Sequence, residues 1–218
     1  MKGKLLYIVV LVLLIPLFSW AQSNYKYDHI QAFGLKVGAN YFFADLQARQ
    51  WDISPEMSYT AGLVYSFANK KYVGLQLELL YSSRKWKESF NGFSVNTDLQ
   101  YLEIPLMTNI SLGNGRMKYI INLGTYFAVN IGKNQSSDFP WEDEFYQSVK
   151  SREERKGDFG LLLGGALRYI SKVGIFQLDA RFVYGYQKLY NEDATDFKAS
   201  NMMGGQLGII YMMNFDKE

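Results

Sequence analysis

The sequence contains no cysteine, a single histidine and only four prolines among its 218 residues. Without cysteine there are no disulfides, no thiol nucleophile, no cysteine-bound zinc or iron–sulfur site and no lipid-modified N-terminal cysteine. The lone histidine, His29, argues against histidine-based catalysis and against multi-histidine metal sites. These absences remove several large classes of enzyme and of disulfide-stabilised secreted protein.

An excess of charge of one sign is also missing. The chain has 23 Lys and Arg against 21 Asp and Glu, which excludes a polybasic nucleic-acid arm or an acidic tail as the main theme. We therefore expect no nucleic-acid partner. Aromatic residues and glycine are abundant instead, with 17 Tyr, 15 Phe, 4 Trp and 19 Gly, and this composition with so little proline favours β-structure.

A long apolar run occurs at the N-terminus. Two lysines precede 14 apolar residues over 5–18, and Ser19-Trp20-Ala21 then places small residues at the −3 and −1 positions of a cleavage site. A helix of that length rises only about 21 Å, which is short of the roughly 30 Å hydrocarbon core of a bilayer. The order of charged, apolar and small residues therefore predicts a signal peptide over 1–21 rather than a membrane anchor. A short periplasmic N-terminal segment, 22–32, is expected to follow.

Beyond this segment, apolar and polar residues alternate with a period of two. Leu75, Leu77 and Leu79, for example, alternate with Gln76 and Glu78. Strict alternation over such lengths predicts strands with one apolar face. The pattern recurs eight times, over 33–43, 58–67, 73–82, 101–106, 118–130, 159–169, 176–186 and 203–213.

The predicted connections alternate in length. Four are long, 45–56, 87–97, 133–157 and 188–199, and the three between them are tight turns at 68–71, 112–116 and 171–173. Bacterial outer-membrane barrels have short periplasmic turns, long external loops and an even number of strands. We therefore predict an all-β protein, an eight-stranded antiparallel up-and-down transmembrane β-barrel over 33–215. It would lie in the outer membrane of a Gram-negative cell with its N-terminus in the periplasm.

Alternation alone does not decide which face points outward, because a soluble barrel that binds an apolar ligand has the same period. Three features favour the membrane barrel, whose partner is outer-membrane lipid. Small residues dominate the polar face and suit a narrow interior, and aromatic residues gather near strand ends, as in interfacial girdles. Charges of both signs also lie on the polar face, where they would form a structural cluster in the lumen: Lys36, Glu78, Glu103, Lys118, Arg168, Asp179 and Arg181.

Pro105 lies inside the fourth predicted strand and cannot donate a hydrogen bond to a neighbouring strand. We expect a β-bulge near the periplasmic end of that strand to accommodate it.

Tyr101-Leu102-Glu103-Ile104-Pro105-Leu106 resembles the Y-L-E-I-P-L signature of the PorT-like family of outer-membrane β-barrel proteins. Similar, weaker likenesses occur at 34–40, 158–165 and 180–185, so the resemblance spans about 30–215. It implies an eight-stranded barrel and suggests accessory service to type IX protein secretion. The chain departs from many such barrels by continuing as Asp216-Lys217-Glu218 after the aromatic Phe215.

The search for catalytic chemistry gives no catalytic, cofactor-binding or metal-binding residue. His29 precedes the first strand and so lies at the opposite end from the external rim. Glu78 and Glu103 could approach each other as a pair of catalytic carboxylates, but an ion-pair cluster with the lumen arginines is the preferred interpretation. The acidic run around Asp138 and 142–144 does not match a calcium-binding loop, and no phosphate-binding or dinucleotide motif is present.

The loop over 133–157 has a helical pattern. Trp141, Phe145 and Val149 recur every four residues and would form a narrow apolar stripe on a helix that begins near Asp138. Such a helix would either fold over the mouth of its own barrel or serve as an external docking element for a protein or glycan. Aromatic residues of the other loops would extend that surface: Trp51, Trp86, Phe90 and Phe93.

These observations predict a non-enzymatic outer-membrane scaffold, without cofactors, whose external loops interact with a partner and which serves protein secretion. Eight strands leave an interior that side chains fill, which argues against a general porin. The alternative is a soluble periplasmic eight-stranded barrel that binds an apolar ligand.

Overall fold

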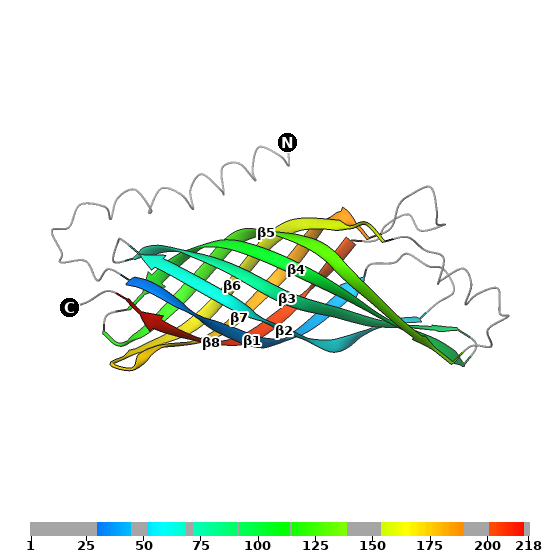
Figure 1. Cartoon of the computed structure of the whole chain (residues 1–218), viewed down its shortest axis with the longest axis horizontal. Coiled ribbons are helices and arrows are strands. Elements are labelled where there is room, and N and C mark those ends of the chain that lie inside the picture. The colour runs from blue at the N-terminus through cyan, green and yellow to red at the C-terminus, as the bar shows by residue number, and fades with distance from the viewer. Residues whose placement is uncertain are drawn as a thin grey trace, which may run out of the picture.

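The structure, a computed structural model, forms one closed barrel of eight strands (Figure 1). It describes residues 30–44, 52–68, 72–90, 92–113, 115–138, 154–189 and 201–215. The predicted signal peptide, His29 and most of the predicted helical loop lie outside these residues. Among the described residues, no helix is long and apolar enough to cross a membrane.

Each strand pairs antiparallel with the next in the sequence, and β8 pairs with β1 to close the ring. The prediction of an eight-stranded up-and-down barrel is therefore confirmed. The strands are β1 (Ile30–Ala44), β2 (Asp52–Ala68), β3 (Val73–Phe90), β4 (Phe93–Leu112), β5 (Met117–Ser137), β6 (Gly157–Ser171), β7 (Gly174–Lys188) and β8 (Asn201–Asn214).

The two ends of the barrel differ. The connections β2–β3, β4–β5 and β6–β7 are all short and lie at one end, which we call the turn end, together with the start of β1 and the end of β8. The other ends of the strands lie at the opposite, loop end, on the right in Figure 1. The first strand begins at Ile30, three residues before the predicted start of the barrel, so the predicted N-terminal segment overlaps it.

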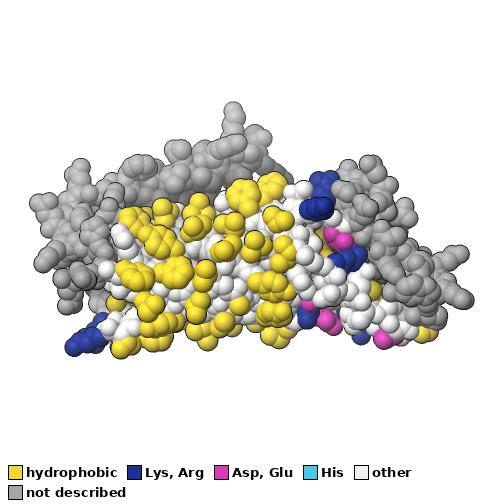
Figure 2. All heavy atoms as spheres, in the orientation of Figure 1, with side chains coloured by type: hydrophobic (Ala, Val, Ile, Leu, Met, Phe, Trp, Pro, Cys, Tyr) yellow, Lys and Arg dark blue, Asp and Glu magenta, His cyan; other side chains and the backbone are white. Residues whose placement is uncertain are grey.

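Apolar side chains face outward and polar ones face inward along the barrel wall. Leu77 is 45% exposed, whereas the adjacent Gln76 is fully buried. Figure 2 shows apolar side chains spread over the wall and charged ones gathered toward its ends. Phe33 and Phe43 are ten residues apart on β1; at a rise of about 3.3 Å and a tilt of about 40°, they bracket roughly 25 Å, the height of a membrane-facing band.

Small residues on the inner face let the strands coil tightly. A Cβ atom added at Gly34 would lie 1.9 Å from the carbonyl oxygen of Tyr211 on the neighbouring strand, and one at Gly62 would lie 2.1 Å from that of Leu79. No side chain fits at such separations. The predicted small inner face is therefore a requirement of the closed, narrow wall.

Pro105 is accommodated without the bulge that the sequence suggested. It pairs with Tyr126 of β5 in continuous register, and on its other side the β3–β4 register is the same before and after it. Between Leu77↔Leu106 and Leu80↔Glu103, however, the β3–β4 pairing is interrupted. The cost of the missing N–H donor is thus a local gap in one ladder at mid-strand, and the expectation of a bulge near the strand end is wrong.

The third connection is far shorter than predicted. The sequence suggested a loop over 87–97, but β3 continues to Phe90 and β4 begins at Phe93, with Gly92 at positive φ in the turn. The even-numbered side chains still face inward, but the polarity of the two faces changes in this segment: Lys85 and Lys87 face outward, while Trp86 is buried. Because this hairpin extends beyond the apolar band, its outer face is polar and its inner face holds the apolar Trp86 beside the buried Glu88, so the pattern of a membrane strand ends before the strand does.

Candidate functional site

Four charged residues form a central cluster inside the barrel: Lys36 of β1, Glu78 of β3, and Asp179 and Arg181 of β7. The Arg181 guanidinium donates two hydrogen bonds of 2.9 Å to the two carboxylate oxygens of Glu78. It also contacts Asp179, with Nη2 2.6 Å from Oδ1, and Lys36 Nζ lies 3.1 Å from the same oxygen. Lys36 Nζ lies 3.4 Å from Glu78 Oε2. Two cations therefore neutralise two carboxylates, all with fully buried side chains.

Neutral amides complete the hydrogen bonding of this central cluster. Gln76 Nε2 donates to Glu78 Oε1 at 2.6 Å, and Asn122 Nδ2 donates to Asp179 Oδ2 at 3.0 Å. Arg168 lies next to the cluster, donating to Gln177 at 2.8 Å and to Gln76 Oε1 at 3.4 Å. Charges removed from water are tolerated only when they are paired and hydrogen-bonded, as the four charged residues of the central cluster are.

A second ionic group lies nearer the loop end and was missed by sequence reasoning. Arg84 of β3 is completely buried, with Nη1 2.6 Å from Asp158 Oδ2 and Nη2 3.1 Å from Glu103 Oε2. Tyr126 also donates its hydroxyl hydrogen to Asp158 Oδ2 at 2.8 Å. We call Arg84, Glu103 and Asp158 the Arg84 cluster.

Three aromatic rings surround the Arg84 guanidinium. Its central carbon lies 4.4 Å from the ring centre of Tyr101, 4.7 Å from that of Phe42 and 5.5 Å from that of Tyr126. Cation–π attraction grows when the cation is desolvated, as Arg84 is here. The rings and the two carboxylates together replace the water that this guanidinium loses.

Arg84 could have been found by continuing the alternation. It lies on the inward series that includes Gln76, Glu78 and Ser82, but the predicted strand stopped at residue 82. Asp158 appeared in the sequence only as part of a family-like segment, with no role attached. Neither residue has a local motif, because their pairing joins positions 74 residues apart.

The seven charged residues predicted for the lumen all lie inside the barrel, but they do not form one cluster. Glu78 and Glu103 belong to different groups, each bound by its own arginine, so they are not a pair of facing carboxylates. Lys118 is buried toward the turn end. The remaining predicted members are the buried Lys36, Arg168, Asp179 and Arg181.

The predicted docking residues fall into two groups. Trp141, Phe145 and Val149 lie outside the described residues, as does Trp51. Trp86 was expected in an exposed loop, but it is only 1% exposed, and its indole N–H donates to Glu88 at 3.0 Å. The expectation that Trp86 extends an exposed surface is therefore wrong. Phe93 is 42% exposed.

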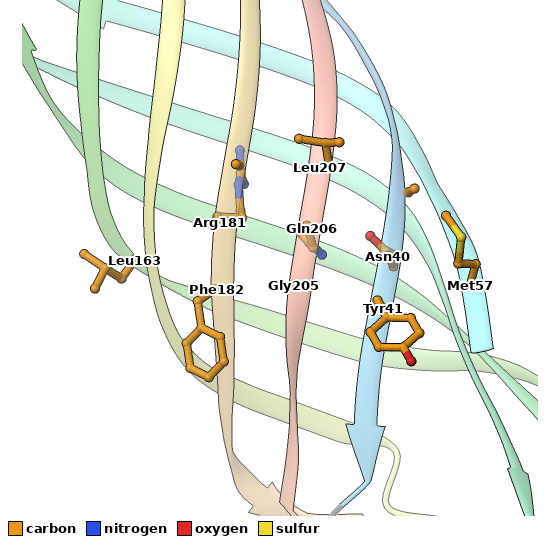
Figure 3. A pocket seen from close by; sticks show the side chains of 11 residues that line it. Asn40, Tyr41, Met57, Leu163, Arg181, Phe182, Gly205, Gln206 and Leu207 are labelled. Atoms are coloured by element: carbon orange, nitrogen blue, oxygen red, sulfur yellow. The ribbon is translucent and has the colours of Figure 1, made fainter. Parts of the chain in front are cut away.

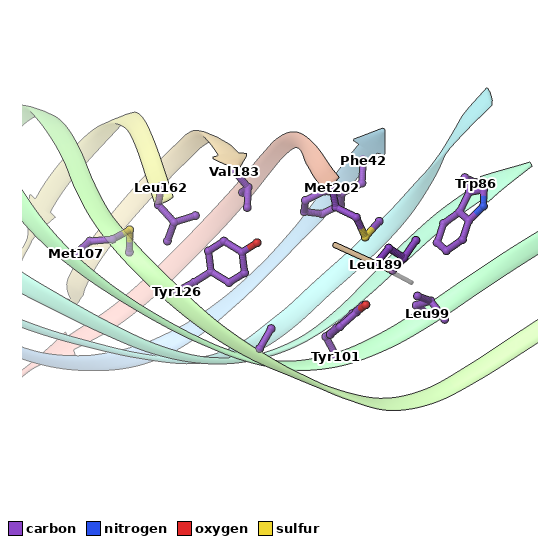
Figure 4. Packing of buried hydrophobic residues seen from close by; sticks show 11 residues of the cluster. Phe42, Trp86, Leu99, Tyr101, Met107, Tyr126, Leu162, Val183, Leu189 and Met202 are labelled. Atoms are coloured by element: carbon purple, nitrogen blue, oxygen red, sulfur yellow. The ribbon is translucent and has the colours of Figure 1, made fainter. Parts of the chain in front are cut away.

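Apolar side chains fill both ends of the interior. The loop-end plug surrounds the Arg84 cluster, and Figure 4 shows its side chains pointing into the barrel from several strands. Its members are Phe42, Trp86, Leu99, Tyr101, Met107, Tyr126, Ala128, Leu162, Val183, Leu189 and Met202. The turn-end plug consists of Ala32, Val64, Ala68, Ile175, Ile210 and Met212, with Ile170 against them.

Paired charges and apolar side chains occupy the interior of the barrel. The buried carboxylates of both clusters are occupied by arginine or lysine. Within the described residues, no group of three or more His, Asp or Glu side chains could hold a metal ion. The apolar face of the alternating strands is exposed on the outer wall, whereas a soluble barrel with an apolar ligand would have that face inside. That alternative arrangement is wrong for this chain.

Comparison with known proteins gives a family and a fold. Residues 20–191 match the family model described as outer membrane protein beta-barrel domain. No curated protein sequence matches the chain. Among solved structures, OprG of Pseudomonas aeruginosa is similar with a TM-score of 0.51 and 11% identity, over 85% of this chain and 94% of that one.

Two further structures are similar at lower scores. The attachment invasion locus protein Ail of Yersinia pestis, solved with the heparin analogue sucrose octasulfate, has a TM-score of 0.45 and 15% identity, over 84% of this chain and 99% of that chain. Neisserial surface protein A has a TM-score of 0.46 and 13% identity, over 83% of this chain and 97% of that chain. At such identities the likeness concerns the fold alone.

Proposed function

This chain belongs to the family of outer membrane protein β-barrel domains, and from that premise we propose that it is a non-enzymatic scaffold of the outer membrane. The observation that carries the proposal is the division between its two faces. The outer face is apolar around the barrel, while the inside is filled by paired charges between two apolar plugs. A closed lumen leaves the surfaces, and above all the loop end, as the place of function.

The orientation follows from the order of the chain. We infer that residues 1–21 are a signal peptide and that the turn end faces the periplasm, because the first strand starts there. The loop end then faces the outside. Three of the four connections at the loop end are longer than those at the turn end, which supports this placement, since outer-membrane barrels have short periplasmic turns and longer external loops.

The loop end offers a raised, polar edge for interaction. The β3–β4 hairpin and the end of β5 extend together beyond the apolar band, as the long strands at the right of Figure 1 indicate. Their outward residues are polar, and Lys85 pairs with Asp98 at 3.5 Å across the two strands. A rigid sheet that carries loops is a common platform for binding a partner. We propose that a partner protein binds this edge.

Accessory service to protein secretion is the finer part of the proposal. It is supported by the Tyr101–Leu106 signature, which resembles that of PorT-like barrels. Within this signature, Glu103 binds Arg84 and Tyr101 stacks on it, while Leu102, Ile104 and Leu106 face outward. The signature therefore combines one side of the buried Arg84 cluster with one strip of the membrane-facing wall.

Crosslinking in intact cells tests this function. A photoreactive amino acid placed at the outward position Asn96 of the hairpin should capture a defined protein, and the same group at Met117, at the turn end, should not. Fractionation should recover the chain with outer membranes. Recovery in the soluble periplasm would contradict the membrane placement, and identical capture at both positions would contradict a loop-end partner.

A further inference from the structure

A groove of about 500 Å³ interrupts the outward face of β1, β7 and β8 in the half of the barrel nearer the loop end (Figure 3). Its centre is Gly205 of β8, which has no side chain. In the register of the sheet, Gly205 lies opposite Tyr41 of β1 on one side and Phe182 of β7 on the other. The groove thus arises because Gly205 has no side chain to fill the space between Tyr41 and Phe182.

Small residues lengthen the groove toward the middle of the barrel. Ala39 and Ala180 flank Leu207 in the same way that the two rings flank Gly205. The intervening residues Asn40 and Arg181 point into the barrel, behind the strands in Figure 3. The open face of the groove is therefore apolar and continuous with the membrane-facing wall.

The size of the groove limits what can occupy it. The two strands beside β8 are separated by about 9.5 Å, twice the spacing between neighbouring strands. An α-helix is about 10–12 Å wide with its side chains, which is wider than the slot. A hydrocarbon chain is narrower than either.

A second copy of the barrel is also a poor fit. The groove is lined by 11 residues, whereas a stable protein–protein interface has roughly 20–30 residues on each side. The groove is also concave, so two of them facing each other would leave a void.

We propose that this groove is a binding site for one acyl chain of a bilayer lipid in the leaflet at the loop end. The chain lies over Gly205 between Tyr41 and Phe182 and continues past Leu207 toward the bilayer centre. The inference rests on insertion in the membrane, as the proposed function does, but it adds a fixed lipid position to a wall that would otherwise meet only mobile lipid.

Photolabelling tests the site. The full chain is reconstituted in phosphatidylcholine vesicles with a trace of phosphatidylcholine whose acyl chain bears a diazirine, and labelled peptides are mapped by mass spectrometry after irradiation. We expect label on 39–41, 180–182 and 205–207 to exceed that on the lipid-facing residues of β4 and β5 about fivefold, equivalent to about 1 kcal/mol of preference. Uniform label around the barrel would overturn the inference.

Two variants and a matched control sharpen the test. Gly205→Phe fills the groove, and because an added Cβ there meets no atom within 4 Å, the fold should be unaffected. Phe182→Ala removes one wall. Both should reduce the label to the level of β4 and β5, whereas Thr125→Phe, which adds a ring to the outward face of β5, should leave it unchanged. Undiminished label in Gly205→Phe would contradict the site.

Two controls separate this inference from its premise. Flotation with vesicles and the altered gel migration of unboiled samples report insertion. A chain that floats but labels uniformly refutes the groove alone, whereas a chain that does not float refutes the membrane placement as well. A crosslinked dimer that is lost in Gly205→Phe, without lipid label in the wild type, would assign the groove to a second copy and overturn the inference.

Discussion

Arg181 and Glu78 are 103 residues apart in the sequence, yet Arg181 donates two hydrogen bonds of 2.9 Å to the Glu78 carboxylate in the interior of the barrel. The bidentate pairing fixes both side chains, and Lys36 and Asp179 complete a neutral group around them. A buried group of this kind binds opposite walls of the cylinder to each other. It also means that each member depends on the others for its charge to be tolerated.

Glu78→Gln should therefore destabilise the barrel strongly. The substitution leaves two buried cations facing a single carboxylate, and breaking a buried ion pair by removing one partner costs about 3–5 kcal/mol. Urea titration of the folded chain in lipid vesicles, followed by tryptophan fluorescence, measures this loss in the free energy of unfolding. Asp98→Asn is the matched control: its partner Lys85 is partly exposed, so the expected loss is about 0–1 kcal/mol. Equal losses would contradict the central cluster.

Arg84→Met should be comparably harmful, for a different reason. It removes the cation between Glu103 and Asp158 and leaves two carboxylates facing an apolar plug, at a cost of about 3–5 kcal/mol. Adding Glu103→Gln and Asp158→Asn to the same chain should recover much of that loss, because no buried charge then remains. A mutant cycle of unfolding free energies checks this, and simple additivity would contradict the arrangement.

Leu77→Arg should cost about 2–4 kcal/mol, because Leu77 faces outward near the middle of the band and a lipid-facing arginine is most harmful at mid-depth. Leu112→Arg is the depth control. Leu112 is similarly exposed, at 42%, but ends β4 at the turn end, where the expected cost falls to about 0–1 kcal/mol. Unfolding titrations in vesicles compare the two, and equal costs would show that this face does not meet a bilayer.

Trp86→Ala should reduce the free energy of unfolding by about 3–5 kcal/mol, the usual result of emptying a large aromatic site in a packed core. Phe93→Ala, in the exposed part of the same hairpin, should change it by no more than about 0.5 kcal/mol. The same titration measures both variants. A small effect of Trp86→Ala on the free energy of unfolding would contradict its burial and support the exposed position predicted from the sequence.

The period of alternation sufficed to predict eight strands because a membrane-facing wall demands apolar residues on one face. The prediction from this period failed where the strands extend beyond the membrane-facing wall. Over 83–90 the outward side chains are polar and the inward Trp86 is apolar, so a strand that continues past the band resembles a loop in sequence. Pro105 suggested a bulge that the structure does not have. The missing N–H donor interrupts the β3–β4 hydrogen-bond ladder locally and leaves the register unchanged.

The sequence by itself determined the number of strands, their antiparallel order, the face that meets lipid and the identity of most buried charges, because each of these follows from local patterning along one strand. Only the tertiary structure decided which charges pair, that Glu78 and Glu103 belong to separate arginines, and that Gly205 leaves a slot between two rings. Those relationships depend on the register and closure of strands that are distant in sequence. They form only when the eighth strand pairs with the first and the barrel closes, so no single segment of the sequence predicts them.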